Sequence, residues 1–250
     1  MIVLKTKREL EIMRQAGRIA ANALKAAGAA VEPGVSTWEI DRVVRRSIEK
    51  QGATPTELGY CGFPASACVS VNNVVIHGIP SKKQILKEGD IVSVDLCATY
   101  EGYIGDNAYT FPCGEVSAEA QQLMDATRES MEEGIRAAVA GNRLGDVGSA
   151  VQRYVEARGY SVVRDYVGHG VGAKMHEDPS VPNYGTPGRG VRLLPGMTIT
   201  VEPMINQGVR DVETLADGWT TVTADGKLSA HFENTIAITP DGPVVLTVAD

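Results

Sequence analysis

The sequence lacks a long hydrophobic run, a paired-cysteine motif and an excess of basic charge, and each absence excludes a class of protein. No stretch approaches the roughly 18 consecutive apolar residues of a membrane-spanning helix, and the first ten residues lack the apolar core of a signal peptide. The four cysteines form no CxxC pair, which predicts free thiols and a cytoplasmic location. The formal net charge of −7 argues against nucleic-acid binding. We therefore expect a globular cytoplasmic protein that binds neither membranes nor nucleic acids.

Two capping boxes mark the beginnings of helices in the first part of the chain. Thr6 with Glu9, and Ser36 with Glu39, have the spacing at which a side chain at each position bonds the backbone at the other. Together with the spacing of apolar residues, they predict four helices, over about 6–28, 36–51, 117–139 and 146–158.

Apolar runs bounded by turn signals predict strands in the rest of the chain. Runs 67–71 and 74–78 flank a predicted tight turn at Asn72-Asn73, and runs 91–100 and 103–111 flank a predicted hairpin turn at Glu101-Gly102. Further strands are predicted over 160–167, 198–205, 219–223, 228–238 and 244–248. Helix pairs alternating with antiparallel strands indicate the α+β class.

An internal repeat appears when the chain is aligned with itself at an offset of 107 residues. Gly34 then matches Gly141, Gly52 matches Gly159, and the same offset carries Asp95 onto Glu202. A constant offset across a helix and a distant strand indicates two related halves. We expect one catalytic domain over 1–250, made of two pseudo-symmetric halves, about 1–112 and 113–250.

Four carboxylates interrupt apolar β runs, which is costly unless each is paired or binds a metal. They are Asp95, Asp106, Glu202 and Glu233. One such acid could simply face solvent, but four together indicate a site. With a neutral imidazole they suit two divalent cations about 3.5–4 Å apart, and the available imidazoles are those of His77, His169, His176 and His231. The residues alone predict a two-metal hydrolase, and the scarcity of Lys and Arg beside the acids favours a neutral acyl substrate.

Five segments together resemble the type I methionine aminopeptidases, which have the pita-bread fold. They are VSVNNVVIHGIPS, GDIVSVDLCATYEGYIGDNAYTF, YVGHGVGAKMHEDP, PGMTITVEPMI and DGWTTVTADGKLSAHFENTIAIT. The similarity runs from about Thr6 to Thr247. It implies two pseudo-symmetric halves in which helix pairs cover an antiparallel sheet.

The resemblance implies a metal-binding role for five residues. Asp106 and Glu233 would bridge two metals, Asp95 would complete the shell of one, and His169 and Glu202 that of the other. A metal-bridged hydroxide would attack the scissile carbonyl. Glu202 would also carry a proton from the water to the leaving amine. The two divalent cations could be cobalt, manganese, iron or zinc.

Further residues match the family's substrate-binding positions. His176 would hydrogen-bond the substrate amide and stabilise the tetrahedral intermediate, and His77 would contact the substrate beyond the scissile bond. The methionine side chain would occupy an apolar pocket, and plain core packing is the alternative for each of its residues. The pocket residues are Tyr60, Phe63, Cys68 and Trp219.

Some positions depart from the commonest family pattern. Asn234 stands where a histidine is frequent, and Met175 where an aromatic residue or leucine is frequent. His231 shares the inward face with Glu233 by strand alternation and is expected beside the site rather than as a ligand.

The implied reaction is removal of the initiator methionine from nascent proteins whose second residue is small. The implied partners are nascent polypeptide N-termini and, transiently, the ribosome, and we expect a monomer. A proline-specific aminopeptidase of the same fold is one alternative, although such relatives usually carry an N-terminal domain for which there is no room here. A metal-dependent phosphoesterase and a non-catalytic binding protein are less favoured.

Overall fold

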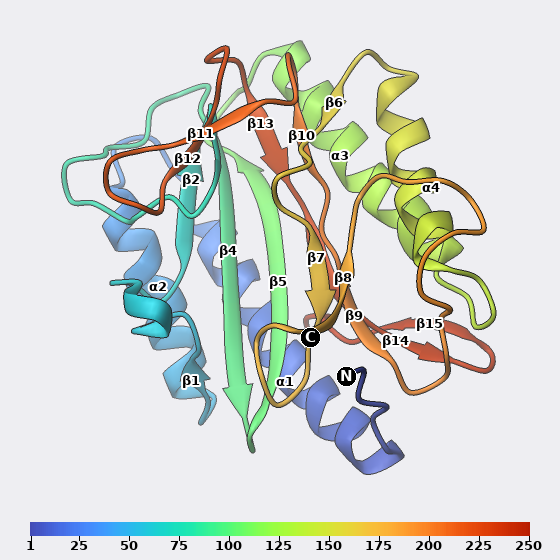
Figure 1. Ribbon diagram of the computed structural model, residues 1–250. Coiled ribbons are helices and arrows are strands. Elements are labelled where there is room, and N and C mark those ends of the chain that lie inside the picture. The colour runs from blue at the N-terminus through green and yellow to red at the C-terminus, as the bar shows by residue number, and fades with distance from the viewer.

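Four helices cover a large antiparallel sheet in the computed structural model, which describes all 250 residues (Figure 1). The helices are α1 (Lys7–Ala29), α2 (Thr37–Lys50), α3 (Ala118–Ala137) and α4 (Leu144–Glu156). Thr6 and Ser36 each accept the predicted capping hydrogen bond, from the backbone of Glu9 and of Glu39. The four predicted helices are confirmed, and none of them is both long and apolar enough to cross a membrane.

Nine strands form the main sheet, and all of its pairings are antiparallel. Its path runs through β1 (Thr54–Pro55), β4 (Ile91–Tyr100), β5 (Tyr103–Pro112), β14 (Glu233–Thr239), β9 (Thr198–Val201), β7 (Gly168–Gly170) and β8 (Glu177–Val181). Beside this path, β2 (Cys68–Val71) pairs with β4 and β15 (Gly242–Val245) pairs with β14. The predicted α+β class is confirmed, with helix pairs covering an antiparallel sheet.

Two three-stranded sheets complete the fold. One consists of β13 (Ser229–His231), β10 (Met204–Asn206) and β6 (Ser161–Val162). The other consists of β11 (Val212–Thr214), β12 (Thr221–Thr223) and β3 (Val74–Ile76). Of the strand predicted over 160–167, only the short β6 forms.

The hairpin of β4 and β5 has the predicted register. Glu101 and Gly102 both have positive φ, 47° and 81°, as a two-residue hairpin turn requires. Cys97 lies opposite Asp106 and the partner of Asp95 is Ala108, so the two aspartates are diagonal neighbours on one face.

The predicted turn at Asn72-Asn73 reverses the chain but does not create a β-ladder between its flanking strands. Instead, β2 pairs with β4 and β3 pairs with β12. The Asn72 side chain accepts from the backbone of Ile91 at 3.0 Å and donates to Asp90 at 2.8 Å. These bonds hold the end of β2 against the start of β4.

Two predicted strands are broken in the structure, each next to a glutamate. The run over 198–205 divides into β9 and β10 around Glu202-Pro203, and the run over 228–238 divides into β13 and β14 at Phe232. Pro203 has no N–H to donate to a ladder. After each break the chain passes between the main sheet and the sheet of β6, β10 and β13. Glu202 and Glu233 therefore lie at the junction of two sheets.

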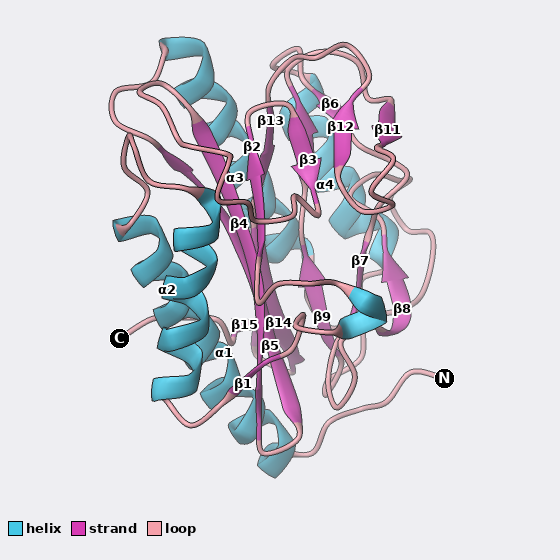
Figure 2. Cartoon of the chain, turned by 90° about the vertical axis from the view of Figure 1, so that its left-hand side faces the viewer, coloured by secondary structure: helices cyan, strands magenta, loops and turns pink.

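Each helix pair covers its own hydrophobic cluster. Side chains of α1 and α2 meet those of β2 and β4, and side chains of α3 and α4 meet those of β9, β13 and β14. Figure 2 shows α1 and α2 against one face of β4 and β5, with β3, β11 and β12 beyond the other face. A Cβ on Gly105 would lie 2.4 Å from the Cα of Gly17, so α1 crosses β5 at two glycines beside Asp106.

Candidate active site

A cavity of about 380 Å³ contains every residue that the sequence singled out for metal or substrate binding. These residues are Tyr60, Phe63, Cys68, His77, Asp95, Asp106, His169, His176, Glu202, Trp219 and Glu233. Five of them lie on strands β2, β4, β5, β7 and β14, and the others lie in the connections between strands. One end of the cavity is acidic, and the other is walled by aromatic and sulfur-containing side chains.

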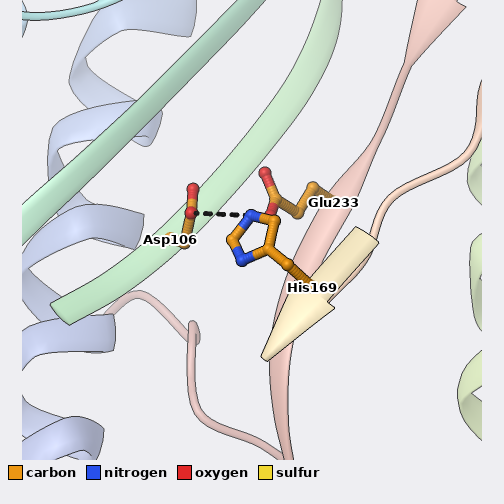
Figure 3. Close-up of side chains that lie close together, drawn as sticks. All are labelled: Asp106, His169 and Glu233. Atoms are coloured by element: carbon orange, nitrogen blue, oxygen red, sulfur yellow. Dashed lines mark ion pairs between the residues drawn. The ribbon is translucent and has the colours of Figure 1, made fainter. Parts of the chain in front are cut away.

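Three of the expected metal ligands converge closely. Atoms of Asp106, His169 and Glu233 that could bind a metal all lie within 4.8 Å of one another. Figure 3 shows them meeting from β5, β7 and β14. Nε2 of His169 lies 3.7 Å from Oδ2 of Asp106 and 3.5 Å from Oε1 of Glu202. Asp95 lines the same cavity but is not part of this closest group.

Hydrogen bonds fix the orientation of His169. Its Nδ1 lies 3.0 Å from the carbonyl oxygen of Gly170, which can only accept, so Nδ1 carries the proton. The lone pair of a neutral ring then lies on Nε2, the atom that faces the acids. The His169 backbone donates to the Thr200 hydroxyl at 2.9 Å, and that hydroxyl donates to Glu202 at 2.5 Å. Thr200 thus holds two of the expected ligands.

Asp106 is held by its own backbone and by the strand beside it. Its N–H donates to the Thr235 hydroxyl at 3.2 Å, and that hydroxyl donates to the Asp106 carbonyl at 2.8 Å. Behind it lies the contact of Gly105 with α1. Because β5 is packed tightly against α1 and bonded to β14, the Asp106 side chain has little freedom to move away from a metal.

The acids repel one another in this enclosed space. Burial, followed by the negative charge of Asp106, raises the pKa of Asp95 and of Glu233 well above its usual range. Burial likewise raises the pKa of Glu202, against the opposing effect of its bond to Thr200. Oε1 of Glu233 is buried without a hydrogen-bond partner. Crowded carboxylates, an orphaned oxygen and a directed imidazole lone pair are what a divalent cation would satisfy, so the residues fit a metal.

His176 lies at the mouth of the cavity beside His169, with the two ring centres 4.4 Å apart. Its Nδ1 lies 2.8 Å from the hydroxyl of Tyr60. Burial of the ring and the neighbouring His169 lower the pKa of His176. A neutral ring that accepts at Nδ1 has its proton on Nε2 and can donate that proton to a substrate.

His77 closes the apolar part of the cavity. It adopts a φ of 59°, and its ring makes edge contacts with Tyr166 and Trp219. Burial lowers its pKa to about 4, so the ring is neutral at pH 7. Trp219 also meets Phe63 edge-on, with ring centres 5.1 Å apart. These rings enclose a space suited to a flexible apolar side chain.

The other positions that the sequence singled out divide between the cavity and its surroundings. Met175 lines the cavity. The side-chain Oδ1 of Asn234 instead accepts from the Thr247 hydroxyl at 2.7 Å, away from the cavity. His231 is buried outside the lining, and its Nε2 has no hydrogen-bond partner. Glu177, next to His176, forms a nearly buried ion pair with Lys5 at 2.5 Å.

One acid in the cavity wall was not predicted from the sequence. Glu57 lines the cavity, is only 7% exposed, and has an Oε2 atom without a partner. It lies in an irregular segment between β1 and the short 3₁₀ turn Tyr60–Gly62, where no periodic pattern marks an inward position. Its one signal is that it stands three residues before Tyr60, a predicted pocket residue.

Comparison with known proteins agrees with the fold and the site. The pattern of metallopeptidase family M24 matches residues 11–240. A methionine aminopeptidase of Clostridium perfringens is 53% identical, over 99% of each chain. The crystal structure of a methionine aminopeptidase from Thermotoga maritima superposes with a TM-score of 0.97 at 47% identity, over 99% of each chain. A prolidase from Pyrococcus horikoshii shares the fold at 24% identity, with a TM-score of 0.80, and this chain covers 65% of it.

The fold and the cluster of acids and imidazole define a metal-dependent peptidase, and the chain belongs to metallopeptidase family M24. Its full-length similarity places it among the methionine aminopeptidases of that family. It is therefore an enzyme, as the sequence predicted.

Proposed function

We propose that the protein removes methionine from the N-terminus of nascent proteins whose second residue is small. The observation that supports this most directly is the joining of an acidic cluster and an enclosed apolar compartment in one cavity. The acids suit the free amino group and a metal, and the compartment suits the methionine side chain. The relatives that match this chain over 99% of their length are methionine aminopeptidases.

Asp106 and Glu233, together with Asp95, His169 and Glu202, would hold two divalent cations. Cobalt, manganese, iron and zinc all suit such a mixed set of oxygen and nitrogen ligands. When bound, the cations supply a water of lowered pKa and polarise the scissile carbonyl.

The surrounding residues would move the proton and hold the substrate. Glu202, buried and bonded to Thr200, would take the proton of the attacking water and pass it to the departing amine. His176 would donate from Nε2 to the carbonyl oxygen as negative charge develops on it. His77 would contact the substrate beyond the scissile bond.

The methionine side chain would lie between Tyr60, Phe63, Cys68 and Trp219. Phe63 and Cys68 are 3% and 5% exposed, and Tyr60 forms the outer wall. A thioether pairs favourably with aromatic edges. The edge-on contact of Trp219 with Phe63 forms one side of the compartment.

We further propose that the whole chain is one catalytic domain of two related halves. In the main sheet, β4 and β5 occupy positions that mirror those of β9 and β14, and each of these four strands carries or borders an acid. A monomer in the cytoplasm that meets the ribosome only transiently is consistent with a small protein whose substrate is a nascent N-terminus.

A comparison of four substrates tests the proposal. The metal-reconstituted enzyme should release methionine from Met-Ala-Ser and leave Ala-Ala-Ser, Ala-Pro-Ser and a phosphomonoester intact. Cleavage of the proline peptide alone would favour the proline-specific alternative, and hydrolysis of the phosphoester alone would show that the acids serve phosphate chemistry.

A further inference from the structure

Glu57 is the fifth acid of the cavity and comes from a segment that supplies none of the five expected metal ligands. It belongs to the segment that also supplies Tyr60 and Phe63, two walls of the side-chain compartment. It is not in the group of metal-binding atoms that lie within 4.8 Å of one another. Asp95 and Glu202 lie outside that group too, but Glu57 differs from them in lying on a segment whose other cavity residues wall the side-chain compartment.

The backbone holds Glu57 firmly in this position. Thr56, the preceding residue, donates its N–H to the Cys97 carbonyl on β4 at 3.0 Å, and its hydroxyl lies 2.8 Å from that of Thr99. The Glu57 carbonyl accepts from the N–H of Tyr60 at 2.9 Å. Bonds on both sides of the residue leave its side chain directed at the cavity that it lines.

The Glu57 carboxyl group lacks a full set of partners within the protein. The side chain is almost fully buried, and Oε2 makes no hydrogen bond. Burial is the main reason why the pKa of Glu57 lies well above its usual range, and the charges of Asp95 and Asp106 add to it. A neutral carboxyl group has an O–H to donate, and a buried donor without an acceptor is costly.

In the proposed function, the methionine side chain that fills the compartment would supply that acceptor. A methionine side chain carries a thioether sulfur, a weak acceptor, near its end. Norleucine has the same length and nearly the same shape, but a methylene group replaces the sulfur. Phe63 and Trp219 would contact both side chains in the same geometry and favour the sulfur only through weak sulfur–aromatic contacts, whereas Glu57 can donate a hydrogen bond to methionine and not to norleucine.

Building on the proposed function, we propose that Glu57 is a specificity-determining residue that favours a first-residue side chain with a hydrogen-bond acceptor at the sulfur position over its hydrocarbon isostere. The selection operates because norleucine leaves the buried carboxyl group unpaired when it excludes water from the compartment. A site built around a hydrogen bond rejects the analogue that lacks it.

The test compares kcat/KM for Met-Ala-Ser and norleucyl-Ala-Ser in three forms of the metal-loaded enzyme. The wild type should prefer methionine by about tenfold, as expected for one buried hydrogen bond. Glu57→Gln retains a donor and should keep most of the preference, whereas Glu57→Leu should bring the ratio to about one to two. Phe63→Leu is the control, because it alters the compartment without removing a hydrogen-bond donor and should slow both substrates while keeping most of the methionine preference.

Binding of the free amino acids gives a second measurement that does not depend on turnover. Calorimetry should show the same preference of the wild type for L-methionine over L-norleucine, and its loss in Glu57→Leu. Equal ratios in wild type, Glu57→Gln and Glu57→Leu would overturn the role of Glu57 and leave the proposed function intact. Failure of the wild type to cleave either peptide would instead overturn the proposed function.

Discussion

The hydroxyl of Tyr60 lies 2.8 Å from Nδ1 of His176, so one aromatic wall of the cavity also sets the tautomer of the imidazole at its mouth. Since the hydroxyl can donate to Nδ1, the imidazole proton is placed on Nε2. In the proposed function, binding of the methionine side chain against Tyr60 and donation by His176 to the substrate would be coupled through this one contact.

Tyr60→Phe keeps the ring of the compartment wall and removes only this hydrogen bond. We expect kcat/KM for Met-Ala-Ser to fall about two- to tenfold, mainly through kcat, with an unchanged content of bound metal. Tyr100→Phe, at the far end of β4, is the matched control and should behave as wild type. An unchanged kcat in Tyr60→Phe would show that His176 does not need Tyr60 for its orientation.

Asp106→Asn should abolish metal-dependent activity while the protein stays folded. The variant removes one of several buried, mutually repelling carboxylates, so the metal-free form should unfold at a higher temperature than metal-free wild type. Added manganese or cobalt should raise the melting temperature of the wild type only. Asp125→Asn, on the exposed face of α3, is the control. Wild-type turnover in Asp106→Asn would contradict its assignment as a ligand.

Lys5→Met should destabilise the protein by about 3–5 kcal/mol, because it leaves Glu177 without its partner in a nearly buried ion pair. It should also raise KM, since Glu177 adjoins His176. Urea denaturation and peptide kinetics measure the two effects. Lys7→Met, one position into α1 and exposed, should be neutral.

The double variant Lys5→Met/Glu177→Met separates pairing from packing. It should recover most of the stability that Lys5→Met loses, because no unpaired charge remains. A double variant as unstable as Lys5→Met would show that the lysine acts through its stem rather than its charge.

Glu9→Gln should make stability less dependent on pH. Hydrogen bonds from Thr6 and then from Tyr103 lower the pKa of Glu9 from 4.5 to about 2. Its contribution is therefore complete above pH 4.5 and is lost as the pH falls towards 2. Urea unfolding should show a deficit of about 0.5–1 kcal/mol in the variant at pH 7, shrinking between pH 4 and pH 3. A deficit that stayed constant with pH would mean that the charge of Glu9 is unimportant.

Local rules predicted the elements that local chemistry controls. The capping boxes at Thr6 and Ser36 fix the beginnings of α1 and α2, and a two-residue turn at Glu101-Gly102 leaves only one register for β4 and β5. That register is why the diagonal relation of Asp95 to Asp106 could be predicted from the sequence. The gathering of the predicted site residues into one cavity followed from their resemblance to a known family rather than from spacing alone.

What the sequence did not predict depends on contacts between distant segments. The alternation of apolar residues continues through Glu202 and Phe232, so nothing periodic marks the points where the chain changes sheet; Pro203 was the one local signal. The Asn72 side chain bonds to Asp90 and Ile91 at the start of β4. These bonds favour the pairing of β2 with β4 rather than with β3. Glu57 faces the cavity because Thr56 is tied to Cys97 and Thr99, which no pattern within its own segment reveals.

The junctions at Glu202 and Glu233 also bear on how the molecule folds. The closest cluster draws on residues 106, 169 and 233, and its members meet only where β5, β7 and β14 have already assembled. Long chain closures of this kind form slowly, because their entropy cost comes before the contacts that offset it. Early in folding a cation therefore finds only the Asp95–Asp106 pair of the β4–β5 hairpin, because the other expected ligands arrive with later strands. It would slow unfolding of the finished protein without accelerating its formation.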